Sequence, residues 1–529
     1  MNIPLTPIRF LRYAEQQFAN RIAVVCQNHR YTYTQFSDRV GRLAGALRVA
    51  GVQAGDRVAF LSFNCHRLLE AYYGVLEAGA VLLPLNYRLA PHELAYVLND
   101  SGATVVFATR ELLGVVDSFR NELKSVRSFH LLDAAPEEKW LAPANYEDLL
   151  SAATPYRCDV ASIDENSLAE LFYTSGTSTQ PKGVMLTHRN IYLHALQVTL
   201  HHHTKTEDTY LHTIPLFHAN GWGAAHTVTS VGAKHVMIQR FIPQDVFRLI
   251  EQERVYAMGL VPIMAAALVN CPERTNYDLR SLQWIAIGGA ASSPAIIRES
   301  EEKLGCKCFS GYGLTETSPS LAIAELKPDV RCGPEQRALL QSMTGYAFPG
   351  TELRVVDADD RDVPHDGKTM GEIIARSDGV MAGYWNQPEA TAEALRGGWF
   401  RTGDIAVVVE NGYILITDRK KDIIVSGGEN ISSLEVEKTL SDHPAIYEVA
   451  VIAMKDEKWG EVPMAVVVLR PGCNATESEL IEFCRARLAH YKCPRAIEFC
   501  DTLPKTATGK VLRKELRQKY WGQATLRTV

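Results

Sequence analysis

Residues 171–184 read LFYTSGTSTQPKGV, and the interpretation of the whole chain starts from this stretch. An apolar run typical of a β-strand ends in five hydroxyl side chains within residues 174–179, and Lys182 and Gly183 follow them. Hydroxyl groups and free backbone N–H groups can surround phosphate oxygens, glycine permits a close backbone approach, and lysine supplies a mobile positive charge. The stretch therefore predicts a loop that binds the phosphates of a nucleoside triphosphate.

This loop differs from the P-loop found in many nucleotide-binding proteins. A P-loop would need a glycine at Pro181 and a hydroxyl side chain at Gly183. The pair Gly509 and Lys510 does not belong to a P-loop either, because Pro504 stands at the position of the first glycine of that motif. Loops rich in Ser, Thr and Gly are also common surface connections, and the loop alone leaves that alternative open.

The chain on both sides of the loop has the pattern of a layered α/β protein. Between residues 57 and 310, short β-rich runs alternate with segments of helical periodicity. Helices are predicted at 243–254 and 294–304, where a proline stands at the expected start. The predicted strands are 58–62, 81–85, 104–108, 210–214, 235–239 and 284–287.

The C-terminal third of the chain changes character twice. Residues 342–415 are rich in Gly, Asp and Pro between short alternating runs, which predicts antiparallel hairpins in a small barrel or sheet. The charged string TDRKKD at 417–422 follows, and an α+β pattern continues to the C-terminus. We therefore predict an N-terminal domain, 1–417, with two α/β subdomains and a β-rich subdomain, a hinge at 418–422, and a small mobile C-terminal domain, 423–529.

Composition limits the classes of protein to which the chain can belong. Its 529 residues exceed the length of one ordinary domain, and 46% hydrophobic with 22% charged residues is typical of a globular protein. A net charge of -6 gives no electrostatic argument for binding nucleic acid. Residues 419–529 hold 18 Lys and Arg against 15 Asp and Glu, so a basic C-terminal part faces an acidic remainder. Such a part could close over an anionic ligand, although a solvated basic face explains it equally well.

The sequence also indicates where the protein works. Eleven cysteines occur without a Cys-x-x-Cys pair, which fits free thiols better than a disulfide framework or a zinc site. The N-terminal residues lack the pattern of a secretory signal, and no apolar stretch approaches the ~18 residues that a membrane span requires. We expect a cytoplasmic protein.

Four further motifs follow the loop along the chain: GYGLTET at 311–317, FRTGD at 400–404, DRKKD at 418–422 and PKTATGK at 504–510. Together, and in this order, the five motifs resemble those of the adenylate-forming superfamily, which comprises acyl-CoA synthetases, luciferases and adenylation domains of peptide synthetases. The resemblance implies ATP, Mg²⁺ and CoA as cofactor and co-substrates. It implies that a carboxylic acid reacts with ATP to give acyl-AMP and pyrophosphate, after which CoA gives acyl-CoA and AMP.

The resemblance also assigns roles within the nucleotide site. Thr174, Ser175, Thr177 and Lys182 would hold the β- and γ-phosphates, and Glu316 would bind Mg²⁺, which prefers oxygen ligands. Thr315 would reach the α-phosphate, Tyr312 would lie along the adenine, and Asp404 would accept both ribose hydroxyls, with Arg419 beside it. Lys510 would be the catalytic lysine between the substrate carboxylate and the α-phosphate. The full set of implied ATP- and AMP-binding residues is Thr174, Ser175, Gly176, Thr177, Lys182, Gly289, Gly311, Tyr312, Gly313, Thr315, Asp404, Arg419 and Lys510, and the implied catalytic residues are Lys510, Thr315, Glu316 and His218.

The CoA half-reaction is assigned to the C-terminal domain. By resemblance, Lys421 is the hinge residue about which this domain swings after adenylation. Ser426, Gly427, Gly428 and Glu429 resemble the segment that lines the pantetheine tunnel in CoA ligases. A tight turn after the apolar run 423–425 explains the same residues, so both interpretations stay open.

The acyl pocket is expected from residues 215–223 and 287–292. Relatives that activate amino acids usually place an Asp near the first segment, and FHA at 217–219 supplies none, so an unsubstituted acid is favoured. Trp222 is expected either as a pocket wall or as core surface. We expect a medium- or long-chain fatty acid, with an aryl acid such as a cinnamate or benzoate as the alternative. The predicted acyl-pocket residues are His218, Trp222, Gly223, Gly288, Gly289 and Ala290.

Other interpretations remain at this stage. The three consecutive histidines 201–203 suggest a metal site, but neighbouring side chains on a helix or strand diverge by ~100° or ~180°, so we predict a polar loop. The acyl group could pass to a carrier protein instead of CoA, and a luciferase-like oxidation or a non-catalytic nucleotide-binding protein are further alternatives. A small-molecule acid, ATP and CoA are the expected partners, with no nucleic acid and no membrane span, and a homodimer is a candidate assembly.

Overall fold

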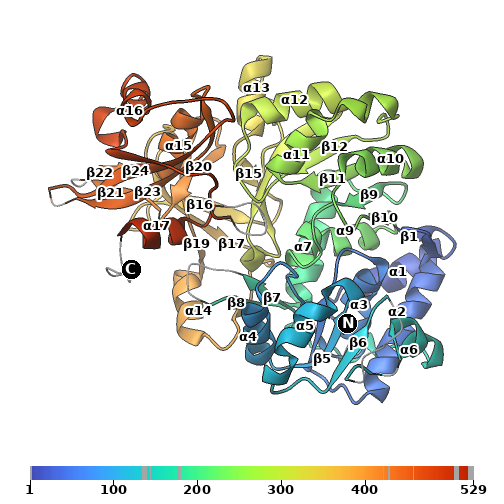
Figure 1. The fold of residues 1–529 in the computed structure, drawn as a ribbon. Coiled ribbons are helices and arrows are strands. Elements are labelled where there is room, and N and C mark those ends of the chain that lie inside the picture. Colours follow the sequence, from blue (N-terminus) through green and yellow to red (C-terminus); the bar gives the residue numbers. More distant parts are fainter. Residues whose placement is uncertain are drawn as a thin grey trace. The chain divides into compact units, whose positions relative to one another are not determined.

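The structure is a computed structural model that describes residues 3–133, 140–142, 144–174, 180–420, 422–426, 429–456, 458–505 and 511–521 (Figure 1). The chain forms two compact units. Unit 1 comprises Met1–Leu353 and Ala375–Phe400, and unit 2 comprises Arg354–Ile374 and Arg401–Val529. The predicted hinge at 418–422 stays a prediction.

The first sheet of unit 1 carries the predicted phosphate loop between two of its strands. Its strand order is β18-β8-β7-β4-β3-β5-β6. Strands β3 to β7 run parallel, β8 pairs antiparallel with β7, and β18 pairs antiparallel with β8. Parallel strands need crossovers, and helices supply them here. The strands are β3 Arg57–Leu61, β4 Val81–Pro84, β5 Ala103–Ala108, β6 Ser128–Leu131, β7 Leu168–Thr174, β8 Lys182–Thr187 and β18 Gly383–Tyr384, and the helices are α2 Tyr33–Val49, α3 His66–Glu77, α4 Pro91–Ser101, α5 Leu113–Phe119 and α6 Tyr146–Ala152.

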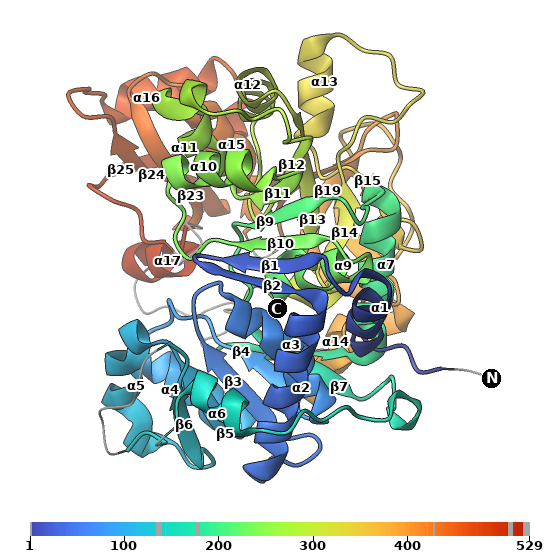
Figure 2. The same ribbon diagram turned by 90° about the vertical axis from the view of Figure 1, so that its right-hand side faces the viewer.

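The second sheet of unit 1 has the order β15-β14-β13-β12-β11-β9-β10-β1-β2. Figure 2 shows α10, α11 and α12 on one side of this sheet and α9 on the other. Its strands are β1 Ile22–Cys26, β2 His29–Thr32, β9 Thr209–His212, β10 Lys234–Met237, β11 Ala257–Leu260, β12 Trp284–Ile287, β13 Lys307–Gly313, β14 Ser320–Ile323 and β15 Tyr346–Ala347. The other helices of unit 1 are α1 Ile8–Phe18, α7 His188–His202, α8 Ala219–Trp222, α9 Ala224–Ser230, α10 Pro243–Glu253, α11 Pro262–Val269, α12 Pro294–Leu304, α13 Pro334–Gln341 and α14 Pro388–Ala394.

Local sequence explains where many of these helices begin and end. Thr32 and Gln35 form a capping box at the start of α2, which satisfies two backbone N–H groups of the first turn. Proline occupies the first turn of α4, α10 and α12, where its missing N–H costs nothing. The predicted helices at 243–254 and 294–304 are therefore confirmed, and all six predicted strands overlap observed strands.

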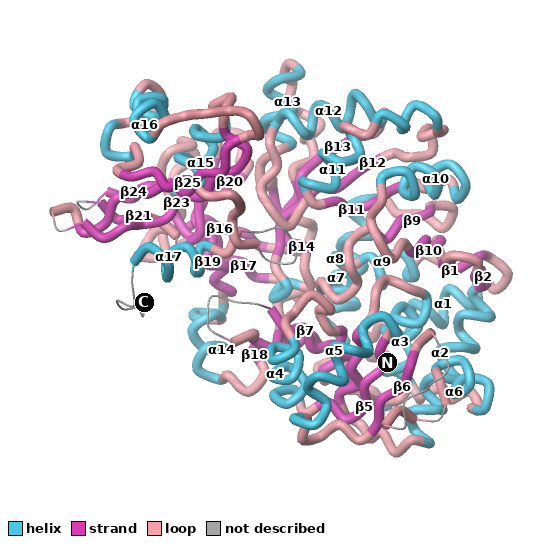
Figure 3. The backbone as a smooth tube through the Cα atoms, viewed as in Figure 1, coloured by secondary structure: helices cyan, strands magenta, loops and turns pink. Residues whose placement is uncertain are grey.

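Buried helices join the two sheets of unit 1. Eleven of the twelve residues of α3 are buried, and this helix contacts β4 of the first sheet and β1 of the second. Helix α7 packs on β7 and β8 of the first sheet and on α9, which contacts β9 and β10 of the second. Figure 3 shows how helices and strands alternate along the backbone. The layered α/β architecture expected from the sequence is confirmed.

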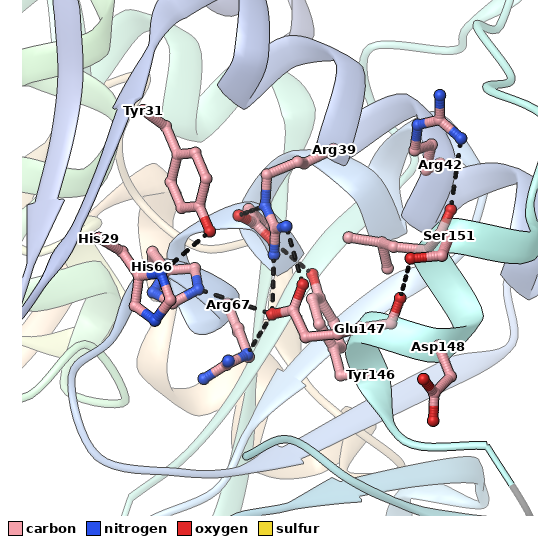
Figure 4. Close-up of polar contacts among 12 residues, drawn as sticks. His29, Tyr31, Arg39, Arg42, His66, Arg67, Tyr146, Glu147, Asp148 and Ser151 are labelled. Carbon is pink, nitrogen blue, oxygen red and sulfur yellow. Dashed lines mark hydrogen bonds and ion pairs between the residues drawn. The ribbon is translucent and has the colours of Figure 1, made fainter. Parts of the chain in front are cut away.

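A network of charges holds the N-terminal helices together (Figure 4). Arg39 on α2 donates to Glu70 on α3 at 2.6 Å and to Glu147 on α6 at 2.8 Å. Arg67 donates to the same Glu147 at 2.7 Å, and the buried Tyr146 hydroxyl donates to Glu70 at 2.7 Å. Because Glu70 is fully buried, these donors are what make its burial tolerable, and the network fixes α2, α3 and α6 as one block.

The β-rich region forms a four-stranded sheet of order β16-β17-β19-β20. Strands β19 and β20 pair antiparallel, as predicted for this region. Within unit 2, a further sheet of order β22-β21-β24-β23, with β25 beside β24, packs with α15 and α16 around an apolar core that includes Ile424, Val436 and Leu480. The strands are β16 Glu352–Val356, β17 Gly371–Arg376, β19 Phe400–Val408, β20 Ile414–Arg419, β21 Ile424–Ser426, β22 Glu429–Ile431, β23 Ile446–Asp456, β24 Gly460–Leu469 and β25 Ala496–Phe499, and the helices are α15 Ser433–Ser441, α16 Glu477–Arg485 and α17 Arg513–Trp521.

Two expectations about the environment can be compared with the structure. All eleven cysteines are described, and all are free thiols. Among the described helices, none combines the length and the apolar character needed to traverse a bilayer. The cytoplasmic location stays a prediction.

Candidate active site

The predicted phosphate loop joins two antiparallel strands, β7 and β8. Thr174 ends β7 and Lys182 begins β8, and the two residues are direct partners in the register. Both side chains therefore stand at the mouth of the connection. The residues between them that the sequence assigned to phosphate binding, Ser175, Gly176 and Thr177, lie outside the described residues.

Close packing fixes the start of β8 against a segment from far along the chain. A side chain at Gly183 would place its Cβ 2.9 Å from Cβ of Trp385 and 3.1 Å from the ring of Tyr173. The backbone N–H of Trp385 donates to the Gly183 carbonyl at 2.7 Å, and the Tyr173 hydroxyl donates to the Asp100 carboxylate at 2.5 Å. Glycine is required here because the two aromatic side chains occupy the space of a larger residue.

This packing brings Tyr384 beside two predicted site residues. Its hydroxyl donates to Oε1 of Glu316 at 2.9 Å, and Nζ of Lys182 lies 4.9 Å from its ring centroid. Burial, and then the Glu316 carboxylate, raise the pKa of Tyr384, so the phenol stays neutral and remains a donor. The sequence analysis missed Tyr384, because only the pairing of β18 with β8 brings it to the site.

Glu316 is presented on a short, firmly bonded turn. Residues Thr315–Thr317 form a 3-10 turn directly after β13, and the Thr317 hydroxyl bonds within it. Ser318 has a φ of 68° and donates through its hydroxyl to the Gly379 carbonyl at 2.7 Å. The Glu316 carbonyl also accepts from the Met381 N–H at 2.8 Å. The carboxylate therefore has a defined position at the end of the strand.

The Glu316 carboxylate fits the Mg²⁺ that the family implies. Oε1 is held by Tyr384, and within the described part of the chain Oε2 has no hydrogen-bond partner. A carboxylate oxygen is the type of ligand that Mg²⁺ prefers. The resemblance placed four residues around the nucleotide, and they lie on β13 and on the turn that carries Glu316: Gly311, Tyr312, Gly313 and Thr315.

Trp222 lies over glycines at the ends of two neighbouring strands. A Cβ at Gly288 would be 3.1 Å from Cη2 of the indole, one at Gly259 would be 3.0 Å from Cε3, and one at Gly289 would be 3.6 Å from Cζ2. The indole is therefore in van der Waals contact with the C-terminal ends of β11 and β12. Of the predicted pocket residues, the structure brings Trp222, Gly288 and Gly289 together, and the backbone of Ala290 follows directly.

A buried network sets the loop that carries Trp222. Glu170 on β7 is fully buried and accepts from His226 at 2.7 Å and from the Asn220 amide at 3.0 Å. Asn220 has a φ of 50° and Trp222 a φ of 61°, a backbone region that larger residues rarely adopt. The network ties this loop to the strand that ends in the phosphate loop. Sequence reasoning missed Glu170 and Asn220, because no local motif marks them.

Two further predicted pocket residues are placed by ring contacts. His218 precedes α8, and its ring centroid lies 4.5 Å from that of Phe217. A Cβ at Gly223 would lie 2.6 Å from Cε1 of His194, so this position requires glycine. Nε2 of His194 in turn accepts from the Ser320 N–H at 3.1 Å, just after the Thr315–Thr317 turn.

The predicted ribose-binding pair lies in unit 2. Asp404 on β19 is buried, and Arg419 on β20 is its register partner. Nε of Arg419 lies 2.5 Å from Oδ1 of Asp404. The buried carboxylate and the guanidinium are therefore already paired, and the ribose-binding role of the pair stays a prediction.

The predicted CoA segment is only partly described. Ser426 is buried and pairs with Gly460 of β24, and Glu429 is exposed on β22. The carboxyl side chain of the nearby Asp418 is buried and accepts from the Ser433 N–H at the start of α15. Four further predicted residues lie outside the described residues: the predicted hinge residue Lys421, the predicted CoA-binding residues Gly427 and Gly428, and the predicted catalytic Lys510.

Comparison with protein families gives two matches in chain order. Residues 11–385 match the model of the AMP-binding enzyme family. Residues 435–510 match the model of the AMP-binding enzyme C-terminal domain. The first match alone covers more than half of the chain, and it includes the phosphate loop, the Glu316 turn and the Trp222 loop.

Individual relatives match along nearly the whole chain. A 4-hydroxybutyrate–CoA ligase of Metallosphaera sedula is 39% identical, with 97% of this chain and 95% of the relative covered. A long-chain-fatty-acid–CoA ligase of Thermus thermophilus is 40% identical, with 93% and 90% covered. Among solved structures, an anthranilate CoA ligase in complex with anthranoyl-AMP superposes with a TM-score of 0.86 at 26% identity, covering 98% of both chains.

Proposed function

The chain belongs to the AMP-binding enzyme family and is an AMP-forming acid–thiol ligase, and from this premise we propose that its acid is a medium- or long-chain fatty acid. The acid reacts with ATP to give acyl-AMP and pyrophosphate, and CoA then gives acyl-CoA and AMP. The observation that carries the proposed acid is the apolar surface that Trp222 forms with neighbouring glycines. Trp222 and the glycines 259, 288 and 289 offer an apolar surface, and residues 215–223 and 287–292 contain no acidic side chain to pair with a substrate ammonium.

The described residues support a division of labour in the adenylation step. Two anions must approach each other, so positive charge and fixed donors at the phosphates are the main requirement. We assign Thr174 and Lys182, with Ser175 and Thr177, to the β- and γ-phosphates. A Mg²⁺ ion, when bound through Glu316, would neutralise phosphate charge. Tyr384 orients that carboxylate, and Asp404 with Arg419 holds the ribose.

The remaining assignments complete the two half-reactions. Lys510 stabilises the charge that develops as the carboxylate attacks the α-phosphate and pyrophosphate leaves. After a swing about Lys421, the segment 426–429 guides the CoA thiol to the acyl carbonyl, and AMP leaves as the thioester forms. Thr315 contacts the α-phosphate, and Tyr312 lies along the adenine.

The test is the acid profile of the wild-type enzyme and of Trp222→Ala. Pyrophosphate release and CoA-dependent AMP formation are measured with straight-chain acids from butyrate to stearate, and with benzoate, cinnamate and several amino acids. We expect turnover on fatty acids and an optimum displaced to longer chains in Trp222→Ala, because removal of the indole deepens the pocket. Trp140→Ala is the control, since Trp140 packs on Phe129 beside the first sheet.

Other outcomes would change the proposal in defined ways. A preference for benzoate or cinnamate would replace the fatty acid by an aryl acid, the class to which the substrate of the anthranilate ligase belongs. Pyrophosphate release without CoA-stimulated AMP formation would make a carrier protein the acceptor. An unchanged chain-length optimum in Trp222→Ala would remove Trp222 from the pocket wall.

A further inference from the structure

Two histidines at the end of α7 converge on one carboxylate. Nε2 of His201 lies 3.6 Å from Oε2 of Glu325, and Nδ1 of His202 lies 3.9 Å from Oε1. All three ligand atoms lie within 4.8 Å of one another. The polar loop predicted for residues 201–203 is wrong for these two residues, because α7 continues through His202.

The convergence is possible because the two rings use different nitrogens. Adjacent side chains on a helix diverge by ~100°. His201 reaches the carboxylate with its distal Nε2 and His202 with its proximal Nδ1, and the two rings are nearly perpendicular, with an interplanar angle of 86°. The distal nitrogen of one ring and the proximal nitrogen of the other can therefore reach the same carboxylate although the two side chains diverge. The sequence pattern alone does not show this arrangement.

Both nitrogens lack the hydrogen bonds that buried polar atoms normally make. Within the described part of the chain, neither Nε2 of His201 nor Nδ1 of His202 has a hydrogen-bond partner, and both atoms are buried. The side chain of His202 is only 7% exposed. A buried polar atom without a partner costs free energy, so a native protein usually supplies one.

Aromatic side chains pack against both imidazole rings. The His202 ring stacks on Trp284, with centroids 4.4 Å apart, and His201 packs on Phe348 at 4.8 Å. These contacts fix both rings. The Glu325 side chain is 33% exposed, which leaves a route from solvent.

We propose that His201, His202 and Glu325 bind a divalent transition-metal ion, with Zn²⁺ as the best fit. Two imidazole nitrogens and one carboxylate are a ligand set that suits Zn²⁺, with a fourth position for water. Bonds of about 2.0–2.1 Å in a tetrahedral site place ligand atoms about 3.4 Å apart, close to the observed separations. The site is separate from the proposed Mg²⁺ ligand Glu316, and it joins the end of α7 to the residues after β14.

The test uses the full chain without a histidine tag, after chelator treatment and dialysis. Co²⁺ is titrated and followed by visible absorption, and Zn²⁺ is then added as a competitor, with metal content measured by mass spectrometry. We expect one equivalent of Co²⁺ per chain with a tetrahedral spectrum that lacks thiolate charge transfer, and displacement by Zn²⁺. Co²⁺ should also quench the fluorescence of Trp284, and Trp284→Phe should lose this quenching while keeping the metal.

Matched variants decide whether these residues hold the ion. Glu325→Gln keeps the size of the side chain and should weaken binding at least tenfold, and His202→Gln at least a hundredfold. His203→Gln is the control, because His203 is adjacent and exposed, and it should bind as the wild type does. Thermal unfolding gives a second readout, because a metal that binds only the folded state raises the Tm of the wild type and not of Glu325→Gln. Less than a tenth of an equivalent bound to the wild type, or equal affinity in Glu325→Gln, would overturn the proposal.

Discussion

At the scale of single residues, the candidate site contains a neutral hydrogen-bond donor, the Tyr384 hydroxyl, beside two charged side chains. The Tyr384 hydroxyl holds Glu316, and the Tyr384 ring faces Lys182. A hydrogen bond to a charged group contributes about 1.5–3 kcal/mol, more than a bond between neutral groups. Such a contact orients the carboxylate without neutralising it, which a positively charged partner would do. A tyrosine is therefore suited to the position.

The first prediction removes this hydroxyl. Tyr384→Phe should reduce the rate of pyrophosphate release by about 10- to 100-fold, the loss that a bond of this strength supports, and should raise the Mg²⁺ concentration needed for half-maximal rate. Steady-state assays over a Mg²⁺ series measure both effects. Tyr447→Phe, at an exposed position in unit 2, is the control. If the rate of Tyr384→Phe depends on the Mg²⁺ concentration as the wild-type rate does, Tyr384 does not orient Glu316 for Mg²⁺ binding.

At the scale of secondary-structure elements, α17 is anchored by charge. Arg513 at its first turn donates to both oxygens of Glu437 on α15 at 2.7 Å, and Arg517 pairs with Asp422. Burial raises the pKa of Glu437, although Arg513 opposes this. Helix α17 begins at Arg513, three positions after the predicted catalytic Lys510 in the sequence.

The second prediction breaks this anchor. Arg513→Met should lower the free energy of unfolding by about 3–5 kcal/mol, because the largely buried Glu437 would lose its cationic partner and keep only the bond from the Val451 N–H. Urea denaturation monitored by circular dichroism measures the change. Adding Glu437→Gln to the variant should restore a large part of the loss, and Lys519→Met on the exposed face of α17 should cost little. If Arg513→Met and Lys519→Met lose the same stability, the anchor is not the cause.

At the scale of the whole molecule, several histidines are buried in unit 1. Burial lowers the pKa of His188 to about 4 and that of His194 and His212 to about 3, and it lowers the pKa of His235 as well. Each ring is neutral in the folded state. The unfolded chain binds protons near pH 6.5, so unfolding takes up protons at any pH between the two values.

The third prediction follows from this difference. The contribution of these histidines is fully present above pH 6.5 and is lost as the pH falls from 6.5 toward 4, at up to about 1.4 kcal/mol per pH unit for each ring. Urea unfolding from pH 8 to 5 in EDTA measures the slope. His188→Gln should reduce the slope, and His203→Gln, at an exposed position, should not. A free energy of unfolding that stays constant from pH 8 to 5 would contradict this account.

The fourth prediction tests the proposed swing of the C-terminal domain. Lys510→Ala should greatly reduce acyl-AMP formation while sparing thioester formation from supplied acyl-AMP, because in the proposed mechanism the lysine is needed only before the swing. The two half-reactions are measured separately by pyrophosphate release and by CoA consumption. Lys505→Ala, five residues earlier in the same motif, is the control. Equal loss of both half-reactions would rule out the swing.

The sequence by itself determined the features that depend on neighbouring residues. The order of strands and helices from 57 to 310 follows from local periodicity, and proline positions mark the helix starts. The hydroxyl-rich stretch between Thr174 and Lys182, and the motif that carries Glu316, follow from the spacing of residue types within a few positions. Such patterns are visible in the chain because the interactions behind them are local.

Only the tertiary structure decided which distant residues meet. Tyr384 reaches Glu316 because β18 pairs with β8, about two hundred positions earlier in the chain, and such pairing has no local signal. Trp222 lies on Gly259 and Gly288 because their strands are neighbours in the sheet. His201 and His202 converge on Glu325 because the packing of α7 brings its end to this carboxylate, and because the two rings reach it with different nitrogens. Packing sets these contacts, and packing depends on the whole fold.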